Sequence, residues 1–212
     1  MNPILLEELA SYNIIQFGEF FYAFPKGSKT PNLENLGEEG INKLKGVFSA
    51  PSLDKIKKNI LSDPNQARRH GLPVQIEVFG FYNIVAWGVD YYGIPKGLGP
   101  LDITKVEVEK EKGVYANRSL EQLKEEIKSN INEMKENFRP IRLENFGFYN
   151  IVAWGLDYFG LPKLHGPVDL RKDDLSKIEG AFADNSLANL KKRIENYCRE
   201  LHRREKKRTE VG

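Results

Sequence analysis

The spacing of apolar and polar residues along the chain first fits two adjacent strands and then a helix. The sequence therefore predicts a hairpin followed by a helix. Residues 81–87 and 91–95 are rich in aromatic and β-branched side chains, and Gly88-Val89-Asp90 separates them as a turn. Residues 113–116 predict a further short strand after a glycine-rich loop. Apolar residues then recur every three or four positions from 120 to 138, which predicts one amphipathic helix. Ser119 stands where its N-cap belongs, with Gln122 as a capping-box partner.

The same pattern occurs twice with almost the same residues. The segment FGFYNIVAWG stands at 79–88 and again at 146–155, and the match continues through residues 103 and 170. Further on, GVYANRSLEQL at 113–123 matches GAFADNSLANL at 180–190, at the same offset of 67 residues. Such self-similarity indicates tandem copies of one supersecondary unit.

A third, diverged copy precedes these two. YNIIQFGEFFYAFPKG at 12–27 aligns with residues 82–97, and GVFSAPSLDKI at 46–56 aligns with 113–123. We expect a helix from Leu53 that stops before Pro64. Copies two and three share a lead-in at 73–81 and 140–148, whereas copy one has LLEELAS there, so we expect its lead-in to differ.

These observations predict an α+β fold of three tandem β-hairpin–loop–short strand–helix repeats. The repeats span 1–70 (diverged), 71–138 and 139–212, the last with a basic C-terminal helix. One hairpin and one helix cannot bury their own apolar faces, so we expect the units to pack into one compact or pseudo-symmetric array. The sequence leaves open whether they stack or close around an axis.

Composition narrows the class of protein. The 212 residues are 40% hydrophobic and carry a formal net charge of +2, which excludes a disordered chain and gives no global field for nucleic acid. No apolar run has the length of a membrane span, and Glu7 and Glu8 stand where a secretory signal would be basic or apolar. We therefore expect a cytoplasmic protein. Its one cysteine, Cys198, excludes an intramolecular disulfide and a cysteine-cluster metal site.

The repeated motif YNIV-x-WG-x-x-YYGIPK-x-x-GP-x-D, followed by a G-V-x-A step and an S-L-x-x-L helix, resembles a short repeat of bacterial proteins. That repeat occurs in tandem beside glycosyltransferase or methyltransferase domains, in proteins tied to surface-polysaccharide synthesis. The resemblance implies a non-catalytic accessory role in glycan synthesis. Copy one departs from the motif, with Phe17 in place of Trp87 and Trp154, and Phe20 in place of Asp90 and Asp157.

Aromatic residues and a Gly-Pro-x-Asp step recur in copies two and three. Flat aromatic faces stack on sugar rings, and carboxylates accept hydrogen bonds from sugar hydroxyls or an incoming peptide. We therefore predict ligand-binding contacts at Trp87, Tyr91, Asp102, Trp154, Tyr158 and Asp169. The alternative is that the aromatics are purely structural, packing in the core and across strands, and that the aspartates belong to turns.

The C-terminal segment is the one region with a strong charge bias. Its basic residues are Arg199, Arg203, Arg204, Lys206, Lys207 and Arg208. They either contact nucleic acid or another anionic surface, or end a solvated helix whose dipole favours cations.

Motifs for catalysis, metal binding or cofactors are missing, and the three histidines occupy no equivalent repeat positions. We therefore expect no enzyme activity, no metal and no cofactor. The first hypothesis is a repeat protein that binds a carbohydrate-type ligand or a protein partner, with homo-oligomer formation open. The second is a protein–protein scaffold, and an enzyme or a nucleic-acid binder comes last.

Overall fold

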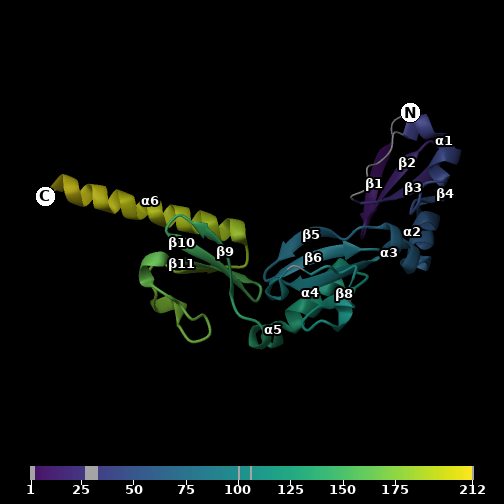
Figure 1. Ribbon diagram of the computed structural model, residues 1–212. Helices are drawn as coiled ribbons and strands as arrows, with labels where there is room; N and C mark the ends of the chain where they lie inside the picture. The colour runs from purple at the N-terminus through teal and green to yellow at the C-terminus, as the bar shows by residue number, and fades with distance from the viewer. Residues whose placement is uncertain (1–2, 27–32, 100, 106, 212) are drawn as a thin grey trace. The chain divides into compact units, whose positions relative to one another are not determined.

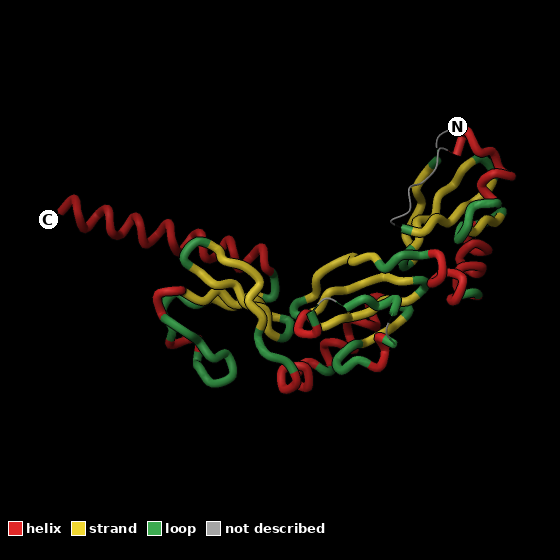
Figure 2. The backbone as a smooth tube through the Cα atoms, in the orientation of Figure 1, coloured by secondary structure: helices red, strands yellow, loops and turns green. Residues whose placement is uncertain are grey.

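The computed structural model describes residues 3–26, 33–99, 101–105 and 107–211 (Figures 1 and 2). It confirms the α+β class. Each sequence repeat forms one four-stranded antiparallel sheet accompanied by helices, and the strands of each sheet follow chain order from one edge to the other. The three similar units are consistent with the tandem repeat.

In its described residues, repeat one has four strands and three helices. The strands are β1 (Ile4–Leu9), β2 (Tyr12–Phe17), β3 (Phe20–Pro25) and β4 (Phe48–Ala50), and the helices are α1 (Leu33–Asn42), α2 (Leu53–Ser62) and α3 (Pro64–His70). The predicted hairpin is β2–β3, in which Phe17 pairs with Phe20 across the turn. The predicted short strand is β4, which pairs with β3.

Repeats two and three have the same order of strands. Repeat two contains β5 (Val74–Phe79), β6 (Tyr82–Trp87), β7 (Asp90–Pro95), η1 (Lys96–Leu98), η2 (Val108–Lys110), β8 (Tyr115–Asn117), α4 (Leu120–Ser129) and α5 (Ile131–Asn137). Repeat three contains β9 (Ile141–Phe146), β10 (Tyr149–Trp154), β11 (Asp157–Pro162), η3 (Lys163–His165), η4 (Leu175–Lys177), β12 (Phe182–Asp184) and α6 (Leu187–Val211).

The lead-in segment is an edge strand in all three repeats, including the first, where we expected it to differ. One ion pair marks the equivalence of β1, β5 and β9. A glutamate on the edge strand meets a lysine on the helix at 2.8 Å (Glu7–Lys57), 2.6 Å (Glu77–Lys124) and 2.6 Å (Glu144–Lys191). Residues 4–6 (ILL) have no apolar–polar alternation, so the sequence pattern does not indicate the strand β1.

The predicted helix caps are present. The Ser52 side chain accepts a hydrogen bond from the Lys55 amide, and Ser119 and Ser186 cap their helices in the same way. The prediction of one helix over 120–138 is wrong, because α4 ends at Ser129 and α5 begins at Ile131. Asn130 lies at the break, and asparagine is a poor residue for a helix interior.

Helix α6 shows the opposite behaviour. It continues without a break for 25 residues, and in Figure 1 it runs past the end of the sheet of its own repeat. Tyr197 and Cys198 occupy the places that Asp63 and Pro64 hold in repeat one. Neither has the helix-ending chemistry of an Asp-Pro pair, so repeat three has no counterpart of α3 or α5.

Each sheet of repeats one and three is buried on both faces. In repeat one, Tyr12 and Ile14 pack on the helix α2, whereas Ile15 and Tyr22 pack on the opposite side with α1. In repeat three, the neighbours Tyr158 and Phe159 join the helix-side and the loop-side core respectively. In repeat three, loop residues cover the second face of the sheet.

The chain divides into two compact units. Unit one comprises Met1–Glu77, Asn83–Pro95 and Pro100–Ile127, and unit two comprises Val78–Tyr82, Lys96–Gly99 and Lys128–Gly212. Each junction between two repeats lies inside one of these units. Among the helices of the described residues, none has both the length and the apolar character needed to cross a membrane.

Candidate functional site at the repeat junctions

The first junction joins the β1–β2 turn of repeat one to the β6–β7 turn of repeat two. The Ser11 amide and hydroxyl both donate to the Gly88 carbonyl, at 3.3 and 2.8 Å. The Ala10 amide donates to the Tyr91 hydroxyl at 2.9 Å. Ala10 and Ser11 are 1% and 0% exposed, so these hydrogen bonds are shielded from water. The Tyr91 hydroxyl therefore belongs to a contact between repeats.

The second junction uses the equivalent atoms. The Phe81 amide donates to the Gly155 carbonyl at 2.8 Å, as Ser11 does to Gly88. The Tyr158 hydroxyl lies 3.5 Å from the Gly80 carbonyl, and burial raises the pKa of this phenol. Because two junctions of different sequence converge on the same backbone bond, the bond is a property of the repeat.

The residue that follows each turn glycine reaches into the preceding repeat. Val89 is 2% exposed and belongs to the apolar core of repeat one, together with Tyr12, Ile60 and Ala67. Burial of a valine contributes about 1.5–3 kcal/mol. We call this residue the plug and the core that receives it the socket.

Leu156 is the plug of repeat three. A Cβ atom on Gly80 would lie 2.6 Å from the Leu156 Cα atom and 2.7 Å from the Gly155 carbonyl oxygen, so the two turns are in backbone contact. Phe81, 0% exposed, packs on Phe138 with ring centroids 5.8 Å apart. The turn that carries Leu156 therefore lies against the β5–β6 turn of repeat two.

The glycine before each plug is required by geometry. Gly88 and Gly155 have φ of +63° and +69°, a region that side chains rarely adopt. A Cβ atom at these positions would lie 2.6 Å from the Arg68 Cγ atom and 2.4 Å from the Lys135 Cε atom. The Trp-Gly motif therefore places a bare backbone against the basic residue of the preceding repeat.

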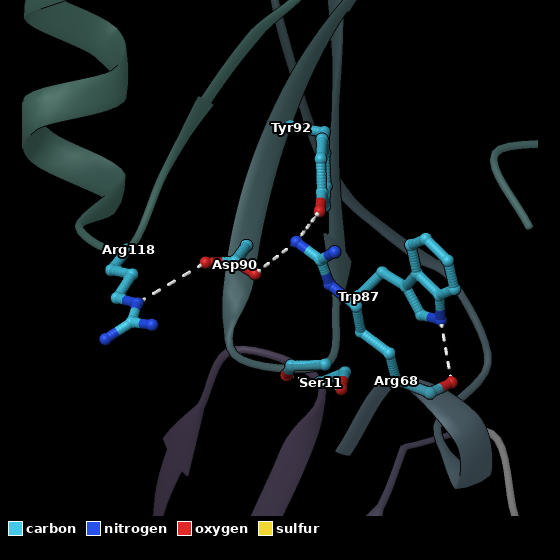
Figure 3. Close-up of polar contacts among 7 residues, drawn as sticks. Ser11, Arg68, Trp87, Asp90, Tyr92 and Arg118 are labelled. Carbon is cyan, nitrogen blue, oxygen red and sulfur yellow. Dashed lines mark hydrogen bonds and ion pairs between the residues drawn. The ribbon is translucent and has the colours of Figure 1, made fainter. Parts of the chain in front are cut away.

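Trp87 completes the first junction. Its Nε1 donates to the Arg68 carbonyl at 3.1 Å (Figure 3). It also donates to the Gly71 carbonyl at 3.2 Å, just beyond the end of α3. The Arg68 guanidinium lies 5.5 Å from the centroid of the Trp87 ring, within the range of a cation–π contact. The indole thus ties repeat one to repeat two.

Arg68 also forms the polar centre of this junction. It donates to Asp90 at 2.7 Å and to the Tyr92 hydroxyl at 2.6 Å, and Arg118 approaches Asp90 from the other side at 3.7 Å (Figure 3). The Asp90 side chain is 14% exposed, so the pair with Arg68 is partly desolvated and more than a surface ion pair. Asp90 therefore links its own repeat to the preceding helix.

The second junction has a weaker polar part. The Lys135 ammonium lies 5.1 Å from the centroid of the Trp154 ring, in the place of Arg68. The Trp154 Nε1 is buried and, within the described residues, has no hydrogen-bond partner. The backbone bond and the cation over the indole are thus common to both junctions, whereas the indole hydrogen bond is not.

The turn of repeat one has lost these features. Glu19 occupies the plug position and is exposed, and a Cβ atom on Gly18 would meet nothing within 4 Å. The Gln16 side chain donates to the Gly18 carbonyl at 3.4 Å, which takes the acceptor that the other two turns offer to a neighbour. Phe17 has no indole N–H. The departures of copy one therefore fall on the atoms that make a junction.

Repeat three exposes the surface that corresponds to the one on which repeats one and two receive a neighbouring turn. Phe148 is equivalent to Phe81 but is 76% exposed, and Leu164 beside it in the same pocket is 94% exposed. A surface pocket of about 660 Å³ lies here. It is lined by Phe148, Tyr149, Pro162, Leu164, His165, Glu179, Gly180, Tyr197, Cys198, Leu201 and His202.

The pocket is lined by residues that align in sequence with socket residues of repeat one, although α6 continues where repeat one changes from α2 to α3. Tyr149 and Leu201 stand in the places of Tyr12 and Ala67, which receive Val89 in repeat one. His202 stands in the place of Arg68. Among the described residues, repeat three thus has a socket without a plug.

Asp102 and Asp169 belong to exposed loops. Asp102 accepts from the Thr104 amide and hydroxyl, at 3.1 and 2.6 Å, and pairs with Lys105 at 2.8 Å. The hydrogen bonds from Lys105 and Thr104 lower its pKa to about 2. Asp169 accepts from the Arg171 amide at 3.1 Å. Within the described residues, no hydrogen bond or ion pair joins either carboxylate to the predicted aromatics.

The predicted ligand residues therefore fall into two groups. The aromatic members, Trp87, Tyr91, Trp154 and Tyr158, lie in the junctions, and the two aspartates form local turns. The structure does not bring the six together as one site. Their role as ligand contacts stays a prediction.

The basic segment lies on the last turns of α6. The side chains of Arg199, Arg203, Arg204 and Lys206 are exposed, and Arg199 lies 3.7 Å from Glu195. The side chains of Lys207 and Arg208 lie outside the described part of the chain. Nucleic-acid binding by this segment stays a prediction, as does the expected absence of a metal. In the described ranges, no three His, Cys, Asp or Glu side chains gather closely enough to hold an ion.

Comparison with models of protein families, with curated proteins and with solved structures found no match.

Reasoning from sequence missed the plugs and the open socket. The signal for the plug was present in the alignment of the copies, because Glu19 stands where copies two and three have Val89 and Leu156. No comparable signal exists for Phe148, which lies in a segment identical to that of Phe81.

Proposed function

We propose that this chain is a non-catalytic scaffold for protein–protein interaction, whose recurrent aromatics hold the repeats together. The observation that carries the proposal is the use of the same groups at both junctions. Trp87 and Tyr91 serve the first, and Trp154 and Tyr158 the second. With these side chains engaged inside the chain, the exposed apolar groups of repeat three provide the surface for a partner.

The titratable groups support a role without catalysis. The tyrosines with raised pKa values, Tyr12, Tyr149 and Tyr158, owe the shift first to burial in the repeat cores. Burial lowers the pKa of Lys96, whose ammonium donates to the Gly80 carbonyl at 3.1 Å. Each shift thus has a structural cause in packing or turn formation.

A link to bacterial glycan synthesis rests on the resemblance of the repeated motif. In that setting the scaffold would hold a transferase or another protein of the same process. Direct binding of a carbohydrate-type ligand is the competing hypothesis, and it requires contacts from Asp102 and Asp169, which are exposed.

Thermal melting against glycans, nucleotide sugars and oligonucleotides separates these hypotheses. A ligand at a hundredfold its dissociation constant adds about 2.7 kcal/mol to the free energy of unfolding. The scaffold hypothesis predicts no shift of the melting temperature with any of them. A shift with a glycan that disappears in the variant Asp102→Asn with Asp169→Asn would replace it with ligand binding.

Photo-cross-linking in cells tests directly whether the exposed surface of repeat three binds a protein partner. A photoreactive phenylalanine at position 148 should give one protein adduct of defined mass, since this side chain is 76% exposed. The same group at Glu19, exposed on the turn of repeat one, serves as the matched control. Equal labelling of many proteins from both positions would count against a specific scaffold.

A further inference from the structure

Repeat three exposes a surface that the two other repeats use for a known contact. In repeat one the socket receives Val89, and in repeats one and two the amide of the turn residue, Ser11 or Phe81, donates to the turn-glycine carbonyl of the next repeat. The exposed fraction of the residue in this turn is 0% for Ser11, 0% for Phe81 and 76% for Phe148. The internal junctions therefore show what covers this surface when it is covered.

We infer that the open socket of repeat three binds a hairpin turn of sequence Trp-Gly-aliphatic-Asp-aromatic, presented by another protein of this repeat class. The inference rests on the proposed scaffold function and names the partner of its exposed surface. Phe148 would donate its amide to the carbonyl of the partner's turn glycine. The aliphatic plug would enter the pocket between Tyr149 and Leu201.

The charges near the socket agree with this partner. In the first junction the acidic residue after the plug, Asp90, pairs with Arg68 at 2.7 Å. His202 holds the equivalent position in repeat three, with the exposed Arg203 next to it. An acidic residue after the plug of the partner thus has His202 and Arg203 beside it, while Glu179 also lines the pocket.

A second copy of this chain lacks the required turn. Glu19 would place a carboxylate in the apolar socket, and Phe20 replaces the acidic residue that follows the plug. The Gly18 carbonyl accepts from Gln16. The turn of repeat one thus prevents the head-to-tail self-association that a plug and a socket on one chain would produce.

The test converts the turn of repeat one into a plug. The substitutions Gln16→Ala, Phe17→Trp, Glu19→Val, Phe20→Asp and Phe21→Tyr turn residues 16–21 into a copy of residues 86–91. Combined with Phe148→Asp, they give a probe chain that has a plug but a blocked socket. The wild-type chain has the socket but no plug.

Analytical ultracentrifugation of the two chains gives the result. Mixed in equal amounts, probe and wild type should form a one-to-one complex of twice the mass of either chain. The Phe148→Asp chain without the turn substitutions should form no complex with the probe. The five-substitution chain with Phe148 intact should grow beyond a dimer as its concentration increases.

A folded probe that sediments separately from the wild type would overturn the inference. Circular dichroism melting establishes that the probe is folded. A second probe with only Gln16→Ala, Glu19→Val and Phe148→Asp keeps the three aromatics of repeat one, so it covers the case in which the larger change prevents folding. Failure of both probes, with a specific cross-linked partner still present at position 148, would refute the turn as occupant and leave the scaffold function standing.

Discussion

Phe81 and Phe148 have the same neighbours in sequence and opposite environments. Both lie in FGFYNIVAWG, yet Phe81 is 0% exposed and Phe148 is 76% exposed. The strands and the turn around them are the same. Phe81 packs on Phe138 at the end of α5 and donates its amide to the Gly155 carbonyl of the next turn, and within the described residues Phe148 has neither contact. Identical local sequence therefore produces identical local structure, while burial depends on whether a neighbouring repeat packs against it.

The turns of repeats one and two differ both in sequence and in environment. Val89 and Glu19 hold the same position after a glycine of similar φ, +63° for Gly88 and +65° for Gly18. Val89 is buried in the neighbouring repeat, and Glu19 faces solvent. The sequence here differs where the environment differs, so the plug position is a marker of an internal turn.

The largest effect is expected from a charge in a filled socket. Val89→Asp should lower the free energy of unfolding by about 3–5 kcal/mol, because it leaves an unpaired carboxylate in the core of repeat one. Urea denaturation measures the loss. Glu19→Asp, at the equivalent exposed position, should change the stability by less than about 0.5 kcal/mol. Similar losses in both variants would mean that Val89 is not a plug.

A pair of glycines tests the backbone contact of the second junction. Gly80 and Gly147 both have φ of +56°, so an alanine costs about 1 kcal/mol at either position. Only at Gly80 would the added Cβ atom also meet a backbone, that of Leu156. Gly80→Ala should therefore cost about 1–3 kcal/mol more than Gly147→Ala in thermal or urea unfolding.

Repeat one has an alanine at the position equivalent to Gly80 and Gly147. Ala10 occupies the equivalent turn of repeat one with φ of 47°, so the turn itself accepts a side chain. If Gly147→Ala were as damaging as Gly80→Ala, the loss would come from the turn and not from the junction.

The two tryptophans differ in their hydrogen bonds. Trp87→Phe removes the donor to the Arg68 and Gly71 carbonyls and should cost about 1 kcal/mol beyond the change in ring size. Trp154→Phe removes a buried N–H that has no partner in the described structure, so it should cost less. Chemical denaturation of both variants and of the wild type measures the two losses in the free energy of unfolding. A larger loss for Trp154→Phe would contradict this account of the two junctions.

The stability at alkaline pH depends on the buried tyrosines. Burial raises the pKa of Tyr12 and of Tyr149 to about 12. A group with a raised pKa in the folded state contributes stability below its unfolded pKa of about 10 and loses it as the pH rises toward 12. The free energy of unfolding should therefore fall between pH 10 and 12, and Tyr12→Phe or Tyr149→Phe should make the fall shallower.

Lys96 contributes with the opposite sign. Its lowered pKa favours the folded protein increasingly as the pH rises toward the ordinary lysine value of 10.5. Denaturation curves from pH 8 to 12 separate the two effects, because the lysine acts below about 10.5 and the tyrosines above about 10. A stability that rises throughout this range would contradict the tyrosine assignment.

Local signals in the sequence predicted most of the fold. The alternation around Gly88, the serine caps and the apolar stripe of each helix act between residues close in the chain, and the structure confirms them. The edge strands β1, β5 and β9 were not part of the predicted unit, and in β1 the residues Ile4, Leu5 and Leu6 do not alternate. The break at Asn130 was missed because the apolar stripe continues in phase across it.

The candidate site shows where reasoning from sequence ends. The recurrence of Trp87 and Trp154 marked them as important, but a repeated aromatic fits a ligand platform and a repeat junction equally well. The choice depends on Arg68 and Lys135, which lie 19 residues before each tryptophan and share no motif with it. Their position over the indole rings arises only when α3 and α5 pack on the next turn.

The sequence by itself determined three copies of one unit, with a hairpin, a short strand and a capped helix in each copy. These features depend on side-chain periodicity, turn chemistry and capping, which act over a few residues. Only the tertiary structure decided which aromatics join the repeats and that Phe148 and its socket stay open. Burial and partnership are set by groups distant in the chain, and two identical segments differ as soon as one of them lacks a neighbour.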